Sequence, residues 1–286
     1  MGAMGKILYS NAEVEDLIAR DAVVLIDIRD REQYLAGHLP GAVNIPEFFY
    51  YLAETTDAGL AALHRTFEDL LSCSGVDPDK PAIVYEYALE TWCGASCRGY
   101  WLLDYLGHPR AGVLEKGMVA WLMEGRPVET GAVTREPTVF QVRPRSVVVV
   151  TRDEMLRVLH DPSVTLIDNR HEGEWLGQLA SPYEPDFELP KGRIPGSIWI
   201  EWYNFLKQSL EYSTFKSPEE IRDLCAAHGL TPDSDIILYC FKGARSANSC
   251  VALRLAGFKK VRIYLGSWNE WSRDPSLPVA GAVAVG

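Results

Sequence analysis

The sequence predicts an α/β protein with two similar domains in tandem, each a mainly parallel sheet with helices on both faces. Three observations lead to this fold class. Two parts of the chain carry the same motifs in the same order, strand-like runs alternate with helical runs in both, and 286 residues is a typical length for two domains. Alternating strands and helices are typical of parallel βα units, whose helices cover both faces of the sheet.

Two pairs of motifs show the internal repeat. Val-Leu-Ile-Asp-Ile-Arg at 24–29 recurs as Thr-Leu-Ile-Asp-Asn-Arg at 165–170. Gly-His-Leu-Pro-Gly-Ala at 37–42 recurs as Gly-Arg-Ile-Pro-Gly-Ser at 192–197. The second copy is longer between its two motifs, which indicates an insertion at about 177–191.

The repeat also sets the expected domain boundaries. We expect a first domain at 10–128, a linker at 129–145 and a second domain at 146–282.

The expected elements follow one order in both copies. A helix that starts with a capping residue type precedes an apolar run, and a second apolar run leads into a second helix. The carboxyl ends of such parallel strands are where ligands bind. The expected helices are 11–19, 99–106, 151–159 and 246–256, and the expected strands are 22–28, 82–87, 164–168, 235–240 and 262–264.

The charge balance limits the classes of partner. The chain has 28 basic and 39 acidic residues, a formal net charge of −11. A chain this acidic has no general attraction for nucleic acid or anionic membranes. No apolar run approaches the ~20 residues that span a bilayer, and residues 1–6 lack the apolar core of a secretory signal. We therefore expect a cytoplasmic protein without nucleic-acid or membrane partners.

The six cysteines are too few for a disulfide scaffold. Cys93 and Cys97 could supply two ligands of a metal site, but no second cysteine pair and no nearby histidine completes a set of four. We therefore expect no metal site and no cofactor. If helical, these two would share a face, which leaves a redox pair as an alternative to simple packing. Cys225 and Cys250 lie in amphipathic patterns that predict core positions, and Cys73 lies near a helix end.

Cys240 lies in the most informative segment. An apolar strand ends at this cysteine, a glycine-containing loop follows at 241–245, and a helix is expected to begin near Ser246. Loop amides, the helix N-terminus and the charges of Lys242 and Arg245 all favour a thiolate, so the pKa of Cys240 should fall below the ~8.5 of a free cysteine. Such a thiolate is a nucleophile that needs no separate base. The plainer alternative, a small buried apolar residue, does not explain the composition of the loop.

Together these motifs resemble the tandem-domain rhodaneses, which are the thiosulfate and 3-mercaptopyruvate sulfurtransferases. The resemblance rests on Leu-Ile-Asp-x-Arg, on the Pro-Gly motif, on the strand–cysteine loop and on Gly-Ser-Trp-Asn-Glu-Trp at 266–271, and it covers roughly residues 10–280. It implies two tandem rhodanese-like domains of which the second is catalytic. Glu86 stands in the first copy where Cys240 stands in the second, and a carboxylate cannot carry a persulfide. Cys93 and Arg98 match the Cys-x4-Arg spacing, but Cys93 lies beyond the matched strand end, so the same cradle is not expected there.

The resemblance also implies a double displacement. The Cys240 thiolate attacks the outer sulfur of thiosulfate, sulfite leaves, and cyanide or a thiol then takes the sulfur from the persulfide. Arg170 matches a substrate-binding arginine of the family, although an ion pair with Asp168 explains it equally well. The implied substrate-binding residues are Arg170, Phe241, Lys242, Gly243, Ala244, Arg245 and Ser246.

The sulfur donor is less sharply indicated. The loop Cys-Phe-Lys-Gly-Ala-Arg shares Lys242 with Cys-Arg-Lys-Gly-Val-Thr of the thiosulfate branch and differs more from Cys-Gly-Ser-Gly-Val-Thr of the mercaptopyruvate branch. Phe241 and Arg245 depart from both, which leaves polysulfide or persulfide donors open. We expect a small anionic sulfur donor and a thiophilic acceptor as partners, and a protein acceptor stays open.

Two other functions share features with this loop. Related phosphatases use Cys-x5-Arg, a loop one residue longer that fits phosphate, so Cys240 and Arg245 do not favour a phosphatase. A non-catalytic sulfur carrier with a protein partner would share the same loop, and the insertion at 177–191 offers it a docking surface. Turnover with thiosulfate and cyanide separates an enzyme from a carrier.

Overall fold

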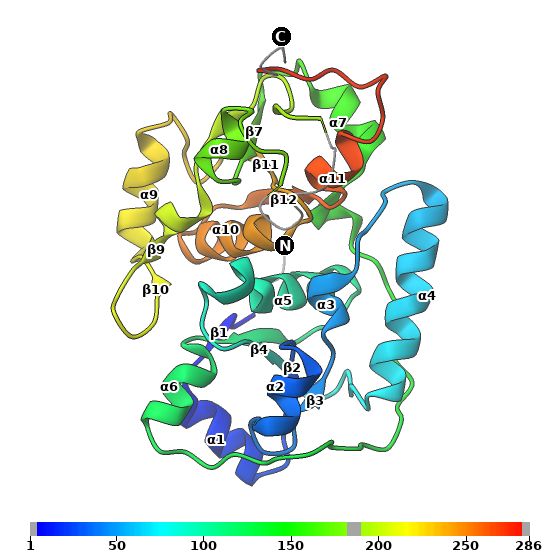
Figure 1. Cartoon of the computed structure of the whole chain (residues 1–286), viewed down its shortest axis with the longest axis vertical. Coiled ribbons are helices and arrows are strands. Elements are labelled where there is room, and N and C mark those ends of the chain that lie inside the picture. Colours follow the sequence, from blue (N-terminus) through cyan, green and yellow to red (C-terminus); the bar gives the residue numbers. More distant parts are fainter. Residues whose placement is uncertain (1–4, 182–189, 282–286) are drawn as a thin grey trace. The chain divides into compact units, whose positions relative to one another are not determined.

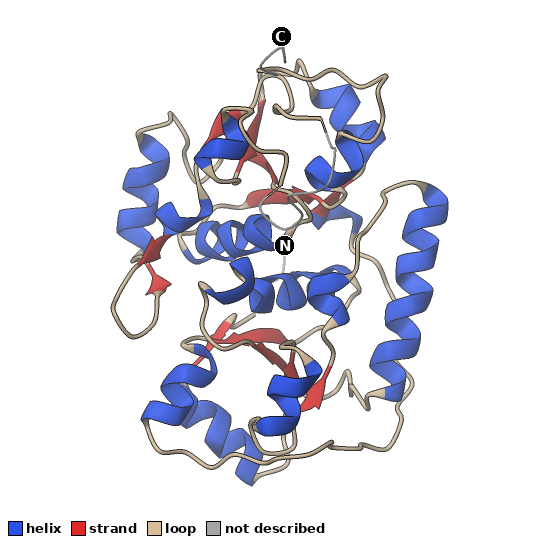
Figure 2. Ribbon diagram, in the orientation of Figure 1, coloured by secondary structure: helices blue, strands red, loops and turns tan. Residues whose placement is uncertain are grey.

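The computed structural model describes residues 5–181 and 190–281. The chain divides into two compact units (Figures 1 and 2). The first comprises Met1–Tyr51, Ala61–Arg145 and Gln208–Thr214, and the second comprises Leu52–Leu60, Ser146–Lys207 and Phe215–Gly286. Each unit therefore contains a short segment from the other half of the sequence, which the repeat did not predict.

The first unit has a five-stranded sheet in the order β1-β5-β4-β2-β3, and all of its pairings are parallel. Helices lie on both faces, with α1, α2 and α6 on one and α3 and α5 on the other (Figure 1). The strands are β1 (Leu8–Tyr9), β2 (Val24–Asp27), β3 (Val43–Asn44), β4 (Ala82–Tyr85) and β5 (Ala111–Leu114). The helices are α1 (Asn11–Ala19), α2 (Arg31–Ala36), α3 (Glu47–Tyr50), α4 (Asp57–Cys73), α5 (Ala95–Tyr105) and α6 (Gly117–Met123), with a 3-10 turn, η1, at Thr91–Cys93.

The second unit repeats this sheet in the order β6-β12-β11-β7-β8, again entirely parallel. The predicted fold class is thus confirmed. The strands are β6 (Val149–Val150), β7 (Val164–Asp168), β8 (Ile198–Trp199), β11 (Asp235–Tyr239) and β12 (Lys260–Tyr264), with a small hairpin of β9 (Leu206–Lys207) and β10 (Thr214–Phe215). The helices are α7 (Arg152–Val158), α8 (Glu172–Trp175), α9 (Pro218–Ala226), α10 (Ala244–Leu255) and α11 (Ser267–Trp271), with 3-10 turns η2 (Ser146–Val148) and η3 (Trp202–Phe205).

Local sequence explains where the first helix of each unit begins. The Ser10 hydroxyl accepts the Glu13 N–H at 3.4 Å, and the Glu13 carboxylate accepts the Ser10 N–H at 2.9 Å, which forms a capping box. Thr151 caps α7 by accepting the Glu154 N–H at 3.2 Å. The predicted helix at 11–19 matches α1, and the one at 151–159 matches α7 within a residue or two.

The repeated Asp-x-Arg motif forms the same buried brace in both units. Arg29 donates to both Asp27 carboxylate oxygens, and its Nη2 donates to the Gly37 carbonyl oxygen at 2.7 Å. Arg170 binds Asp168 in the same way, and its Nη2 reaches the Gly192 carbonyl oxygen at 2.8 Å. The brace ties the end of a central strand to the start of the Gly-x-x-Pro-Gly motif, which explains why the two motifs recur together.

We predict that Arg29→Met destabilises the protein by about 3–5 kcal/mol, because it leaves the buried Asp27 carboxylate without its partner. Urea unfolding measures this loss. Arg20→Met is the matched control, since Arg20 pairs with Asp16 on the exposed face of α1 and such pairs contribute about 0–1 kcal/mol. Equal losses in the two variants would contradict the role of the brace.

Candidate active site

Cys240 directly follows β11 and is 1% exposed. Side chains alternate along a strand, so neighbouring residues face opposite sides of the sheet. Ile237 and Tyr239 pack into the apolar core beneath α7 and α11. The strand pattern therefore directs the Cys240 side chain to the other face, where α10 begins.

Gly243 turns the chain from the strand into the helix. Its φ of +95° lies in the left-handed region that glycine adopts without strain, and it is the N-cap of α10. The Gly243 N–H donates to Cys240 Sγ at 3.1 Å. The helix begins at Ala244, before the predicted start near Ser246, so Ser246 lies in its first turn and is not its cap.

Opposing effects act on the pKa of the Cys240 thiol. Burial raises it, because a charged thiolate loses its hydration. The positive charge of Arg245, the hydroxyl and N–H of Ser246 and the N–H of Gly243 all stabilise the thiolate. Their combined effect is larger, and the pKa lies below its ordinary value. Burial alone has the opposite outcome at Cys225, whose pKa it raises to about 12.

Arg245 supplies its charge from a fully buried position. Its Nη1 and Nη2 donate to the two carboxylate oxygens of Glu174 in α8, at 2.5 and 3.0 Å. A two-point pair of this kind fixes the plane of the guanidinium group. Sequence reasoning missed Glu174. The repeat offered a signal. Four residues after the arginine of the motif, the first copy has the neutral Gln33 and the second copy has the acidic Glu174.

The other predicted loop residues contribute in different ways. The Phe241 side chain is 3% exposed and packs into the apolar core with Trp268 and Trp271, away from the sulfur. Lys242 is 8% exposed and Ala244 is fully buried. Apart from burial, the largest effects on the pKa of the thiol come from Arg245, from Ser246 and from the N–H of Gly243.

The short helix α11 binds the backbone of the cysteine loop. The Trp268 N–H donates to the Cys240 carbonyl oxygen and the Asn269 N–H to the Phe241 carbonyl oxygen, both at 3.0 Å. The Ser267 hydroxyl accepts the Cys240 N–H at 3.3 Å. These residues form the start of α11, so the Gly-Ser-Trp-Asn-Glu-Trp motif supports the cysteine loop through its backbone.

Arg170 lies close to this loop as part of the buried brace. It is fully buried, and the centre of its guanidinium group lies 4.6 Å from the centroid of the Trp268 ring. Of the two expected roles, the ion pair with Asp168 is present, with Nη2 and Oδ2 at 2.7 Å. Its Nη1 has no hydrogen-bond partner among the described residues. Substrate binding by Arg170 stays a prediction.

Glu86 occupies the matching place in the first unit. Its carbonyl oxygen accepts the Met118 N–H of α6 at 2.9 Å, as that of Cys240 accepts an N–H of α11. Its buried carboxyl group accepts the N–H of Ser96 at 3.0 Å and the Ser96 hydroxyl at 2.7 Å. Burial raises the pKa of Glu86 well above its ordinary value. The first unit thus places one of its own carboxyl groups at the start of α5.

The Cys-x4-Arg spacing in the first unit has a different structural basis. Trp92 and Cys93 have left-handed φ angles of +53° and +59°, so no continuous helix runs from Cys93 to Cys97. The Arg98 guanidinium group donates to three backbone carbonyl oxygens at the end of α3, at 2.6–2.8 Å. Arg98 therefore anchors α3. The condition under which Cys93 and Cys97 would share a face, one helix that contains both, is not met.

Most of the expected insertion at 177–191 lies outside the described residues, which end at 181 and resume at 190. Its expected role as a docking surface stays a prediction.

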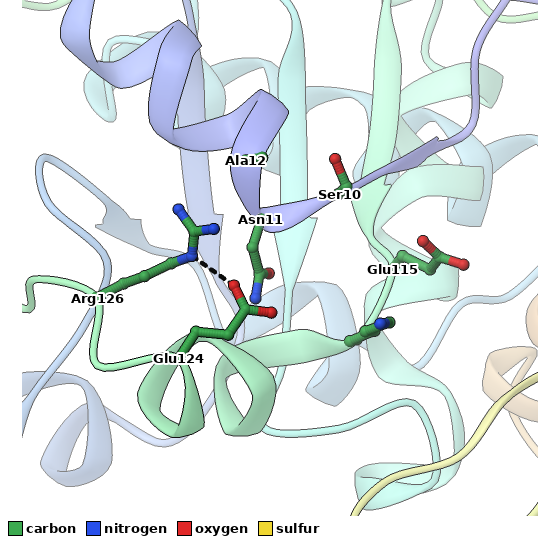
Figure 3. Close-up of a pocket in the computed structure, with 7 residues that line it drawn as sticks. Ser10, Asn11, Ala12, Glu115, Glu124 and Arg126 are labelled. Atoms are coloured by element: carbon green, nitrogen blue, oxygen red, sulfur yellow. Dashed lines mark hydrogen bonds and ion pairs between the residues drawn. The ribbon is translucent and has the colours of Figure 1, made fainter.

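A pocket of about 190 Å³ lies in the first unit beside the start of α1 and contains none of the predicted site residues (Figure 3). Its Arg126 and Glu124 are paired with each other at 2.6 Å. Among the described residues, no helix is long and apolar enough to cross a membrane.

Comparison with known proteins accords with this arrangement. The model of the rhodanese-like domain matches residues 10–124 and again residues 151–274. The chain belongs to the rhodanese-like family of sulfurtransferases. It is 27% identical over 275 residues to a thiosulfate sulfurtransferase of Azotobacter vinelandii and 28% identical over 298 residues to the sulfur carrier protein TtuD of Thermus thermophilus, with 96% of both chains covered in each case.

A solved structure shares the fold. SseA from Escherichia coli, described as a 3-mercaptopyruvate sulfotransferase, superposes with a TM-score of 0.77 at 23% identity, over 92% of this chain and 99% of that one.

We predict that the Cys240 thiolate persists below the ~8.5 at which a free cysteine titrates. The difference in ultraviolet thiolate absorbance between the wild type and Cys240→Ser should disappear only as the pH falls through this lower midpoint. Arg245→Gln should raise the midpoint, because it removes a stabilising charge, whereas the exposed Lys259→Gln should not. A wild-type midpoint at or above 8.5 would contradict the activation of Cys240.

Proposed function

We propose that the protein is a thiosulfate sulfurtransferase that works through a persulfide on Cys240. The observation that carries this proposal is a buried thiol whose pKa is lowered by Arg245, by Ser246 and by the N–H of Gly243, which lies 3.1 Å from the sulfur. These groups stabilise a thiolate before reaction. They also suit a persulfide, whose anionic outer sulfur lies one sulfur–sulfur bond beyond Sγ.

The reaction consists of two displacements. The Cys240 thiolate attacks the outer sulfur of thiosulfate, the sulfur–sulfur bond to the sulfonate breaks, and sulfite leaves with the bonding electron pair. The terminal sulfur of the persulfide is then attacked by cyanide or a thiol, and the thiolate returns. No redox cofactor or metal is needed, because each step exchanges one bond to sulfur for another.

The thiolate would be formed without a general base. Arg245 and the start of α10 stabilise the anion in place, so deprotonation does not depend on a neighbouring histidine. Glu174 would keep the Arg245 guanidinium in position beside the sulfur through its two hydrogen bonds. In the first unit, the buried Glu86 carboxyl cannot form a persulfide, and we propose that this unit is inactive.

Sulfur carriage is the second candidate. It is favoured by the similarity to the sulfur carrier protein TtuD, which is 28% identical. A carrier would load one sulfur on Cys240 and hand it to a protein partner, whereas an enzyme would cycle with thiosulfate and cyanide. Repeated turnover with these two small molecules separates the two functions.

We predict that thiosulfate adds one sulfur atom to the protein and that cyanide removes it again. Intact mass measures both steps. Cys240→Ser should gain no sulfur while keeping its fold, because a hydroxyl forms no persulfide. The matched control is the double variant Cys93→Ala and Cys97→Ala, which should load and turn over normally. Loading that survives Cys240→Ser would refute the assignment.

We further predict that kcat/KM is higher with thiosulfate than with 3-mercaptopyruvate. Lys242 lies two residues after the nucleophile, and its positive charge favours a compact dianion and the sulfite that leaves. Lys242→Ser should lower the efficiency with thiosulfate by roughly ten- to a hundredfold, the effect of losing one charge-assisted contact. Lys259→Ser serves as the surface control. A wild-type preference for mercaptopyruvate would assign the protein to that branch instead.

A further inference from the structure

The unit that carries Cys240 includes a segment from the first half of the sequence. Residues Leu52–Leu60 belong to this unit, although the repeat places them in the first copy. Within the segment, Thr55 is only 5% exposed, whereas its neighbours Glu54 and Thr56 are exposed. Ala53 is buried too, at 4%, but Thr55 is the residue whose hydroxyl and N–H bind the rest of the unit.

Thr55 is held by three hydrogen bonds. Its backbone N–H donates to Glu270 Oε1 at 2.5 Å, and its hydroxyl donates to Glu270 Oε2 at 2.7 Å. The same hydroxyl accepts the N–H of Arg152, at the start of α7, at 2.8 Å. Both oxygens of a nearly buried carboxylate are thus satisfied by one residue of the segment.

Glu270 is itself built into the helix that supports the cysteine loop. Its carboxylate folds back over Gly266, where a Cβ atom would come within 1.9 Å of Oε2. Only a glycine at that position leaves room for this conformation. The carboxylate is therefore fixed at the beginning of α11, beside the N–H groups that bind the loop.

Two peptide groups connect this helix to the nucleophile. The N–H groups of Trp268 and Asn269 hold the carbonyl oxygens of Cys240 and Phe241 at 3.0 Å. A continuous series of contacts thus runs from Thr55 through Glu270 and α11 to the backbone of Cys240. A shift of α11 would move the backbone that places the sulfur against the start of α10.

The first unit provides an internal comparison. There α6 holds the Glu86 and Tyr87 carbonyl oxygens by the same two bonds, both at 2.9 Å, but Ala120 stands where α11 has Glu270. An alanine side chain accepts no hydrogen bond. The start of α1, the helix that corresponds to α7, lines the pocket in Figure 3. The carboxylate that binds Thr55 thus occurs in the unit that contains Cys240.

We propose that Thr55 is a positioning residue for sulfur transfer at Cys240. It acts through Glu270 and α11, and it makes the arrangement of the nucleophile depend on a segment outside the second repeat. The proposal rests on the proposed sulfurtransferase function for its kinetic consequence. Its structural consequence, a change in the pH midpoint of the Cys240 thiolate, can be measured without any turnover.

The test compares three variants of the full-length protein. Thr55→Val keeps the shape of the side chain and removes the hydroxyl, and Thr55→Ser keeps the hydroxyl. Thr56→Val changes the exposed neighbour, whose hydroxyl accepts the Gly59 N–H of the same segment at 3.0 Å. The readouts are kcat and KM with thiosulfate, the pH midpoint of the Cys240 thiolate, and stability in urea.

We expect Thr55→Val to lower kcat by about tenfold with little change in KM, because a small displacement of a reacting group has effects of this size or larger. The thiolate midpoint should rise as well. Thr55→Ser should restore both values, and Thr56→Val should leave both unchanged. Reduced stability with a wild-type kcat and midpoint would overturn the proposal.

Glu270→Gln keeps the test decisive if Thr55→Val does not fold. It preserves the size of the side chain but removes its negative charge, so the hydrogen bonds to Thr55 lose the charge that strengthens them. It should move kcat and the midpoint in the same directions. Absence of sulfur transfer in the wild type would refute the proposed function alone, and a raised midpoint in Thr55→Val would still support the positioning role.

Discussion

The left-handed backbone at Gly243 is the constraint on which the candidate site depends. It turns the chain so sharply after β11 that α10 begins directly over the Cys240 sulfur, and its own N–H reaches Sγ at 3.1 Å. A residue with a Cβ atom would be strained there. Because the turn is this tight, the start of a buried helix and a fully buried arginine both act on one thiol, and together they outweigh the effect of burial.

The two units show how one scaffold places two different side-chain groups after the same strand. Both place a residue after the central strand and hold its carbonyl oxygen from a short helix, α11 or α6. In the second unit a short loop brings a thiol to the helix start, where its pKa is lowered. In the first unit residues 87–93 lengthen the loop, the longer side chain of Glu86 reaches Ser96, and burial raises the pKa of its carboxyl group. Loop length and one side chain account for the difference.

Several buried hydrogen-bonded pairs hold the elements around Cys240 in position. The Asp168–Arg170 brace ties β7 to the Pro-Gly motif, Glu174 holds Arg245, and Glu270 holds Thr55. Each contains a buried charged group that binds its partner inside the protein, so losing that partner leaves a charge or a polar atom uncompensated. Hydrogen-bonded pairs fix the direction of a side chain as well as its position, and the proposed reaction of the thiolate with a small anion requires a defined direction of approach.

The sequence by itself determined the tandem α/β fold, the family and the matching of Glu86 to Cys240, because repeated motifs and strand periodicity are local features of the chain. It also indicated Cys240, Gly243 and Arg245 as neighbours, since they lie within one loop. Only the tertiary structure decided that Arg245 pairs with Glu174, that Phe241 packs into the core, that α10 starts at Ala244 and that Thr55 binds Glu270. These contacts join residues far apart in the chain or depend on one left-handed dihedral angle, and neither leaves a periodic pattern in the sequence.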